Sequence, residues 1–322
     1  MKMTHRRQLC FAYLLAALLL ICAGYILPGL LPGDFVTAAY SGSPVTLDAE
    51  GEQIEQARHE RPYQGFGRYL ADVFTLKWGY SIAFGAPVAV LIFKAFPWTL
   101  LLMGSAHVVS MTAGFVIGVE AAWRRGRAAE RTVTGSMAVM QGIPEIATGV
   151  VLLVVFSYNL GWFPTEGGVT AFADHDVWRR VSDIAHHLAL PFLTLFLAYF
   201  PGDFLLARSG MVLVLGQQYL ETARAKGLPP IRIRYAHAAR NALLPMATRF
   251  GLRIAFMVTG VLVVETIFAY PGLGTLLFNA VALRDVPLVQ GIVLFSSLVV
   301  LGINWGLDAV YGLIDPRVNH AS

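Results

Sequence analysis

The chain has 322 residues, of which 56% are hydrophobic and only 14% are charged, and its formal net charge is +4. Its mean hydropathy is +0.61, whereas an average soluble domain carries about 25% charged residues. Disordered chains and nucleic-acid-binding proteins need dense charge, so this composition excludes both classes and argues against an ordinary soluble globule. It predicts a chain whose solvent is mostly lipid.

Six apolar stretches are long enough to cross a bilayer as helices, which takes about 20 residues each. Pro191 and Pro201 predict a bend near the end of the fourth stretch. The first stretch follows a basic start and could be a signal peptide, but its length and the poor cleavage site around Cys22 favour an uncleaved helix. The sequence therefore predicts an all-α integral membrane protein, a bundle of six transmembrane helices over residues 9–31, 98–121, 134–157, 188–207, 245–267 and 287–312.

The distribution of lysine and arginine predicts the orientation. With the N-terminus inside, the inner segments hold fourteen of these residues and the longer outer segments hold eight. The short connection 122–133 carries four arginines and gives the strongest single indication of a cytoplasmic loop. Both termini are therefore expected in the cytoplasm.

We divide the chain into an N-terminus with the first helix (1–32), an external segment (33–96), a five-helix core (97–314) and a cytoplasmic tail (315–322). The external segment is acidic in places and favours short surface helices over Gln53–Arg61 and Tyr69–Phe74. Its acidic residues suit either a solvated loop or a docking face for an external partner.

The longest inner connection, residues 208–244, is a basic helix–glycine–helix unit. Gln217–Lys226 is rich in helix formers, and Gly227 supplies a left-handed stop. Pro229 and Pro230 can begin a second helix over Ile231–Leu244, with Pro245 marking entry into the fifth span. Charge alone leaves two readings open, a loop lying on anionic lipid and an insert that fits a groove of another protein.

The order of residues decides between these readings. Glu-Thr-Ala-Arg-Ala-Lys-Gly from Glu221, followed by Arg-Asn-Ala-Leu-Leu-Pro from Arg240, resembles the EAA loop of permease subunits of binding-protein-dependent ABC importers. Further segments resemble the oligopeptide/dipeptide/nickel branch of that family: Leu31–Asp34, Leu160–Pro164, His187–Pro191, Glu265–Gly274, Arg284–Pro287, Asp308–Tyr311 and Asp315–Arg317.

The resemblance implies a bundle of the type I ABC importer kind in a bacterial-type inner membrane, with short cytoplasmic coupling helices and an external segment between the first two spans. It implies a transport subunit without catalytic residues that forms half of a path for peptides or a related solute such as a nickel chelate. Implied partners are a second permease subunit, homologous or identical, cytoplasmic ABC ATPases, an external solute-binding protein and the lipid bilayer. ATPase coupling would fall on Tyr219, Glu221, Ala223, Lys226 and Gly227, and an external gate or turn on Pro271, Gly272 and Gly274.

A self-contained secondary transporter is the alternative. It would need inverted repeats and broken helices at matching places in the two halves, and we find no convincing repeat. The sequence also lacks a Gly-x4-Gly-Lys-Ser/Thr phosphate loop and a His-Glu-x-x-His zinc motif, so no ATP site, cofactor or metal is expected.

Ionisable residues within spans are functional candidates, because each costs about 2.5–3.5 kcal/mol at a helix centre. Glu145 is the better candidate for lining the translocation path, and Glu265 is either a second one or a cap for the following turn. Arg249 and Arg253 lie one helical turn apart near the inner end, so we expect both to extend toward the interface. The full set is His107, Glu145, Arg249, Arg253, Glu265 and Asp308.

Overall fold

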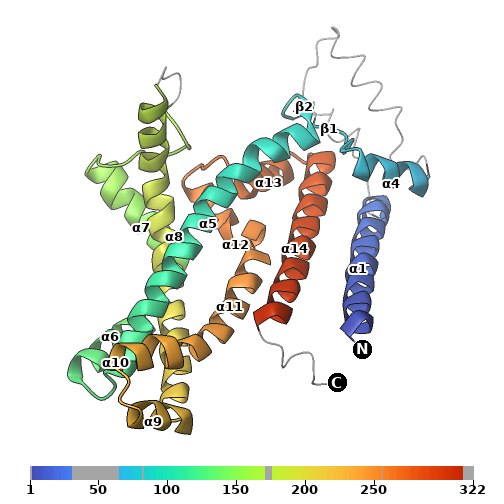
Figure 1. Ribbon diagram of the computed structural model, residues 1–322. Coiled ribbons are helices and arrows are strands. Elements are labelled where there is room, and N and C mark those ends of the chain that lie inside the picture. The colour runs from blue at the N-terminus through green and yellow to red at the C-terminus, as the bar shows by residue number, and fades with distance from the viewer. Residues whose placement is uncertain (1, 31–64, 82, 171–175, 256, 315–322) are drawn as a thin grey trace. The chain divides into compact units, whose positions relative to one another are not determined.

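The computed structural model describes residues 2–30, 65–81, 83–170, 176–255 and 257–314, and within these ranges the chain is almost entirely helical (Figure 1). A two-stranded hairpin is the exception, with Tyr80 opposite Pro87 in antiparallel register. The elements are α1 (Lys2–Leu30), α4 (Phe66–Phe74), β1 (Tyr80–Ser81), β2 (Ala86–Pro87), α5 (Val88–Trp123), α6 (Ala128–Gln141), α7 (Glu145–Leu152), the π-helical η1 (Leu153–Asn159), α8 (Val177–Leu215), α9 (Gln218–Ala225), α10 (Pro230–Arg232), the π-helical η2 (Ile233–Ala239), α11 (Arg240–Ala255), α12 (Met257–Ile267), α13 (Leu273–Ala282) and α14 (Val286–Ile314).

The chain divides into two compact units, one made of Met1–Pro97 with Gly272–Ser322 and the other of Trp98–Pro271. In the first unit α1 packs against α14, and Ile21, Val73 and Leu294 form a small buried cluster with side chains of α4. Asp285 begins α14: its Oδ1 accepts the backbone N–H of Leu288 at 3.1 Å and its Oδ2 accepts the Ser81 hydroxyl at 2.5 Å. An aspartate that caps the third amide of a helix stabilises the helix start.

The second unit is built around α5 and α8, with α6, α7 and α11 packed against α8. The two central helices approach closely at small residues. A Cβ atom on Gly114 would lie 2.7 Å from the Cβ of Asp203, and one on Gly118 would lie 2.7 Å from the carbonyl oxygen of Phe204. Small residues permit this approach, which matters in lipid because packing and polar contacts replace the hydrophobic drive between helices.

Several expected spans are found as long apolar helices. By length and composition α5, α8 and the Val286–Gly306 part of α14 could each cross a membrane. The expected fourth span is longer than predicted, because α8 continues as one helix through Pro191 and Pro201. The first stretch lies in α1 and the fifth in α11 and α12, so the count of six stays a prediction.

The stretch expected as a third span over 134–157 is not one straight helix, and its crossing of the membrane stays a prediction. Residues 128–141 and 145–159 form two helical segments bent by 93°. Gly142 and Pro144 explain the break, because glycine weakens a helix and proline disfavours helical geometry at the residue before it, here Ile143. A helix is present at Tyr69–Phe74 as expected, within α4, and its place on the membrane surface stays a prediction. The helix expected over Gln53–Arg61, the side chain of Asp308 and the tail 315–322 lie outside what the structure describes.

The second helix of the inner connection does not stop at Leu244 as expected. Helical residues run without interruption from Pro230 to Ala255, and Pro245 lies inside α11. A proline there removes one hydrogen bond to the carbonyl of Asn241. Asn241 is exposed, so water can replace the lost donor and the helix continues.

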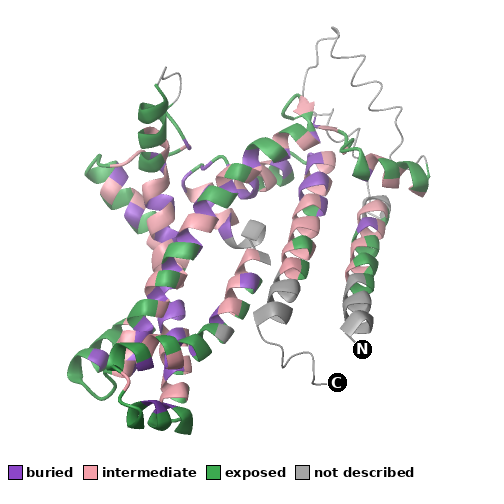
Figure 2. Cartoon of the chain, viewed as in Figure 1, coloured by how far each residue is buried: buried purple, intermediate pink, exposed green. Residues whose placement is uncertain are grey.

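Exposed apolar side chains mark the outer faces of the long helices (Figure 2). On α5 they recur as neighbouring pairs eight residues apart, and each pair is turned by about 80° from the one before it, so the exposed side chains wind around the helix. Exposed apolar side chains on a long apolar helix suit contact with lipid or with another membrane subunit. They are Leu100, Leu101, Val108, Val109, Val116 and Ile117.

Replacement of Gly118 by alanine should destabilise the second unit. The new methyl group would meet the backbone of α8 at Phe204 and the Cβ of Ala207, and overpacking typically costs about 1–3 kcal/mol. We expect Gly118→Ala to lower the thermal unfolding midpoint in mild detergent by several degrees.

The matched control is Gly104→Ala in the same helix, where an added Cβ meets nothing within 4 Å. There alanine should leave the midpoint unchanged or raise it, because alanine favours a helix interior by about 1 kcal/mol over glycine. Equal effects at the two positions would contradict a close α5–α8 contact.

Candidate functional site

The short helix α9 rests on a buried apolar core at one end of the second unit. Its Leu220 and Ala223 are 0% and 7% exposed. They pack into a cluster that also contains residues of α5, α8, η2 and α11: Val119, Ala122, Met211, Ile233, Ala238, Ala239 and Ala242. We call this set the coupling core. Its many alanines let four helices and α9 meet within a small volume.

The turn after α9 is fixed by backbone geometry. Gly227 adopts φ +71°, a left-handed conformation that favours glycine. Its N–H donates to the carbonyl of Arg224 at 2.9 Å, and the next N–H, that of Leu228, donates to the carbonyl of Ala223 at 3.4 Å. Pro230 occupies the first position of the next helix, so the predicted glycine stop and proline start are both present.

Polar contacts hold α9 to the following helix and that helix to α5. The Tyr219 hydroxyl accepts from Asn241 Nδ2 at 2.7 Å and donates to the carbonyl of His237 at 3.4 Å. Glu120, near the end of α5, accepts from the Arg234 guanidinium and from the Tyr235 hydroxyl. Burial and the hydrogen bond to Glu120 raise the pKa of Tyr235 above its usual value, so this phenol stays a donor at neutral pH.

A second ion pair joins α6 to α8. Arg208 Nε donates to Glu130 Oε1 at 2.7 Å, and the side chain of Glu130 is only 4% exposed. Glu130 also accepts the N–H of Gly126 at 3.2 Å, so the arginine-rich loop between α5 and α6 is anchored to the same pair.

The predicted coupling residues come together, but they divide into two kinds. Ala223 faces the coupling core, and Tyr219 is 40% exposed and tied to α11. Glu221, Lys226 and Gly227 are exposed. Among the described residues, no hydrogen bond or ion pair is found for the side chains of Glu221 and Lys226. They form an outward surface, while Ala223 and Tyr219 support it from behind.

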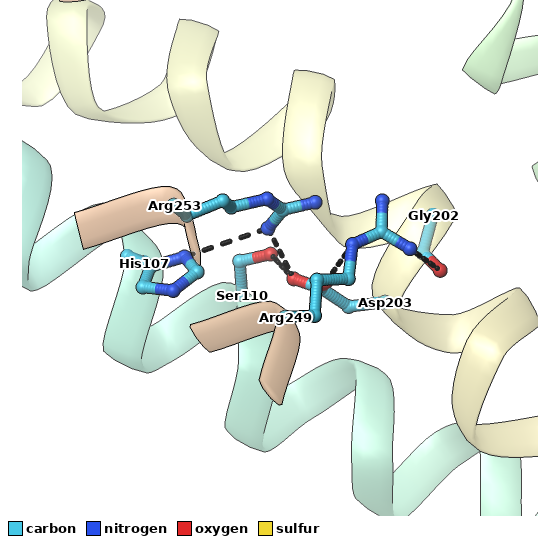
Figure 3. Close-up of polar contacts among 6 residues, drawn as sticks. All are labelled: His107, Ser110, Gly202, Asp203, Arg249 and Arg253. Atoms are coloured by element: carbon cyan, nitrogen blue, oxygen red, sulfur yellow. Dashed lines mark hydrogen bonds and ion pairs between the residues drawn. The ribbon is translucent and has the colours of Figure 1, made fainter. Parts of the chain in front are cut away.

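A buried charge cluster lies on α5, α8 and α11 of the same unit (Figure 3). Asp203, 1% exposed, accepts from Ser110 Oγ at 2.6 Å and from Arg253 Nη1 at 2.9 Å through the same oxygen. Arg249 Nε lies 3.5 Å from the other carboxylate oxygen, and Arg249 Nη1 donates to the carbonyl of Gly202 at 3.0 Å.

Aromatic rings surround the same guanidinium groups. The Arg253 guanidinium lies 4.4 Å from the centroid of the Tyr199 ring, a cation–π distance. His107 is 2% exposed, its Nδ1 lies 3.4 Å from Arg253 Nη1, and its ring stacks on Phe250. Three helices thus contribute to one buried charge cluster. Burying charges costs free energy unless they are paired and hydrogen-bonded.

The expectation that Arg249 and Arg253 extend to the interface is wrong, because both bind Asp203. Sequence reasoning missed Asp203, which looked like the polar end of a span. Two arginines spaced by four residues in one span and one aspartate in another could have indicated the pairing, since charges within a membrane usually pair with one another.

The two predicted path residues occupy different surroundings. Glu145 begins α7 and is half-buried. Glu265 on α12 is 0% exposed and accepts the Thr99 hydroxyl at 2.6 Å, so its carboxylate is already engaged within the chain.

The predicted gate residues follow α12 in a tight turn. Tyr270 N donates to the carbonyl of Glu265 at 2.8 Å, and Ala269 has φ +44°. Pro271 is exposed, and a Cβ on Gly168 would lie 2.8 Å from its Cγ. Gly272 caps the start of α13, and Gly274 is buried in its first turn. A role in gating stays a prediction.

Comparison with known proteins gives consistent findings. Residues 114–320 match the family model described as "Binding-protein-dependent transport system inner membrane component". The chain is 34% identical to the oligopeptide transport system permease protein AppB of Bacillus subtilis (strain 168), covering 88% of this chain and 92% of the relative. It is 33% identical to the di/tripeptide transport system permease protein DppB of Pseudomonas aeruginosa (strain UCBPP-PA14), covering 90% and 91%. It is also 33% identical to the glutathione transport system permease protein GsiC of Salmonella paratyphi A, covering 95% and 94%.

A solved structure of the MetNI methionine ABC transporter in inward-facing conformations shares the fold. The match has a TM-score of 0.51 at 18% identity and covers 70% of this chain and 96% of that chain. This likeness shows the fold of a type I importer permease.

Removal of the Arg234 guanidinium should loosen the coupling core. The side chain of Arg234 is 18% exposed, binds Glu120 and lies 4.7 Å from the centroid of the Trp123 ring. Truncating one partner of a desolvated ion pair costs about 2–5 kcal/mol, so Arg234→Gln should lower the unfolding midpoint in detergent by several degrees.

Arg124→Gln is the control, because Arg124 pairs with the same carboxylate at 3.6 Å but its side chain is 61% exposed. Exposed pairs contribute about 0–1 kcal/mol, so its midpoint should barely move. Equal midpoints for both variants would show that the Glu120–Arg234 contact does not hold the core.

Proposed function

The chain belongs to the family of binding-protein-dependent transport system inner membrane components, the permease subunits of ABC importers, and we propose that it forms half of the translocation path of a peptide importer. It is a transport subunit and not an enzyme, since ATP hydrolysis in such importers is performed by separate subunits. Family membership sets aside the alternative of a self-contained secondary transporter.

One observation carries the proposal for coupling: α9 presents an exposed face while its opposite face is buried in the coupling core. Glu221 and Lys226 are exposed, and Leu220 and Ala223 are buried in the coupling core. A short helix supported in this way suits insertion into a cleft of the cytoplasmic ATPase. Glu221 would supply a polar contact or cap, and Gly227 would set the angle between the two helices.

Movement of α9 would reach the membrane helices through rigid contacts. The coupling core joins α9 directly to α5 and α8. The Glu120–Arg234 pair fastens α5 to η2, and the Glu130–Arg208 pair fastens α8 to α6. Closure of the ATPase pair around ATP would therefore push α9 and tilt α5 and α8 toward an outward-open path. Hydrolysis would reset the inward-open state.

Peptides are the substrate class that the relatives favour. Two of the relatives are named for oligopeptide or di/tripeptide transport, and a third for glutathione, which is itself a peptide. A related solute such as a nickel chelate is the second candidate. The external binding protein would make the first selection.

We further propose a second permease subunit, homologous or identical, and a membrane orientation with both termini in the cytoplasm. The exposed apolar side chains of α5 offer a surface for a membrane partner. The arginine-rich loop around Arg125 leads directly into α6, which Glu130 ties to α8 near the coupling core, and positive charge favours the cytoplasmic side. Glu145 and Glu265 remain candidates for the path, and Pro271, Gly272 and Gly274 for the external gate.

Loss of the α9 surface should abolish ATPase binding without unfolding the permease. In the double variant Glu221→Ala, Gly227→Pro, the exposed carboxylate is removed and proline, with its φ fixed near −65°, cannot adopt the φ of +71° found at Gly227. We expect at least about a tenfold drop in ATPase co-purified in mild detergent, which corresponds to about 1.4 kcal/mol of binding free energy.

Glu166→Ala is the matched control, because it removes one exposed carboxylate from the loop after η1 and should leave ATPase recovery unchanged. The single variant Glu221→Ala distinguishes the effect of losing the carboxylate from the effect of changing the turn at Gly227. A double variant that is folded, inserted and still binds ATPase as well as the wild type does would show that α9 is not the docking helix.

A further inference from the structure

The buried charge cluster contains more positive than negative charge. Arg249 and Arg253 share the single carboxylate of Asp203, and no other carboxylate lies within ion-pair distance of them among the described residues. His107, beside Arg253, adds no negative charge in either protonation state. The surplus is therefore at least one positive charge.

The two guanidinium groups also offer more donors than the cluster accepts. Each has five N–H donors, whereas Arg249 uses only its Nε toward Asp203 and its Nη1 toward Gly202. The Nη2 of Arg249 has no hydrogen-bond partner among the described residues. The planar edge of Arg249 is thus only partly occupied.

Arg249 is the accessible member of the cluster. Its side chain is 33% exposed, against 17% for Arg253 and 2% for Asp203. A guanidinium turned toward lipid within a span costs about 2.5–3.5 kcal/mol, so such groups face the interior of a bundle or a water-filled cavity. The open edge of Arg249 is consequently expected to border an aqueous path.

A predicted path residue lies in the same region. The charged neighbours of Tyr199 are Glu145, Arg253 and Asp203, and Tyr199 also lies against the Arg253 guanidinium. Glu145, the residue chosen from sequence as facing a cavity, and Arg253 of the charge cluster therefore both lie near Tyr199.

We propose that Arg249 binds the C-terminal carboxylate of the transported peptide during translocation, with Asp203 and Gly202 holding its guanidinium in place. The inference rests on the proposed peptide importer. A planar guanidinium matches a carboxylate in charge and in donor geometry. Arg253 adds positive charge behind it, while its own contacts with Asp203 and Tyr199 keep it from closing over the ligand.

The test measures ATP-driven uptake by the complete importer reconstituted in proteoliposomes with its binding protein. Two labelled probes are compared, dialanine and its C-terminal amide, each at a concentration that saturates the binding protein. The wild type should transport the acid faster than the amide. In Arg249→Gln we expect this acid-to-amide ratio to fall about tenfold, the effect of losing one charge-assisted hydrogen-bonded contact.

Two further variants and one further probe sharpen the test. Arg240→Gln removes a guanidinium from the exposed start of the same helix and should keep the wild-type ratio. Arg249→Lys retains the charge without the planar edge and should give an intermediate ratio. It replaces Arg249→Gln in the test if that variant does not fold.

Alanyl-glutamate with an amidated C-terminus carries only a side-chain carboxylate. Its uptake rate should match that of the dialanine amide in the wild type and in Arg249→Gln. An uptake rate that matches that of dialanine itself would contradict binding of the terminal carboxylate.

An unchanged ratio in a folded Arg249→Gln importer would overturn the inference, and so would a wild type that shows no preference for the acid. Loss of the second permease subunit from that variant, with the ratio unchanged, would assign the open edge of Arg249 to a subunit contact instead. Absence of uptake of every peptide by the wild type would contradict the peptide assignment itself, and this inference with it.

Discussion

The close approach of α5 and α8 at Gly114 and Gly118 is the constraint on which the rest of the second unit depends. Lipid does not drive helices together as water does, so backbone proximity and polar contacts must hold them. Because α8 lies directly on these glycines, Asp203 meets Ser110, and farther along the same helix Met211 joins Val119 in the coupling core. The buried charge cluster and the coupling core thus both depend on the same crossing of α5 and α8.

This arrangement gives the permease a mechanical connection between its two sites. α5 carries Ser110 at the charge cluster and Glu120 at the coupling core, and α8 carries Asp203 and Met211. Both helices continue from one site to the other without interruption. In the proposed mechanism, a force applied at α9 would therefore change the position of the groups that hold Arg249 without a separate relay.

Much of this architecture follows from local rules that the sequence displays. Apolar length identified α5, α8 and α14, and the glycine stop with its following prolines located α9 and the start of the next helix. Sequence analysis failed where the role of a residue depends on residues far away in the chain. Asp203 gains its role only through two arginines on another helix, and Pro245 lies inside a helix at a place where Asn241, four residues earlier, is exposed to solvent. The break at Gly142 and Pro144 was visible in composition, but the continuous hydropathy on both sides concealed it.

The break between α6 and α7 has a consequence for the permeability of the membrane to ions. The ends of α6 and α7 together leave about eight backbone polar groups without helical partners, and short turns at Gly142 and Ile143 satisfy two of the carbonyls. Irregular backbone at membrane depth is stable only in contact with protein or water, and residues 141–144 are exposed. At the predicted membrane depth, a partner that covers this bend would also act as a seal against ion leakage.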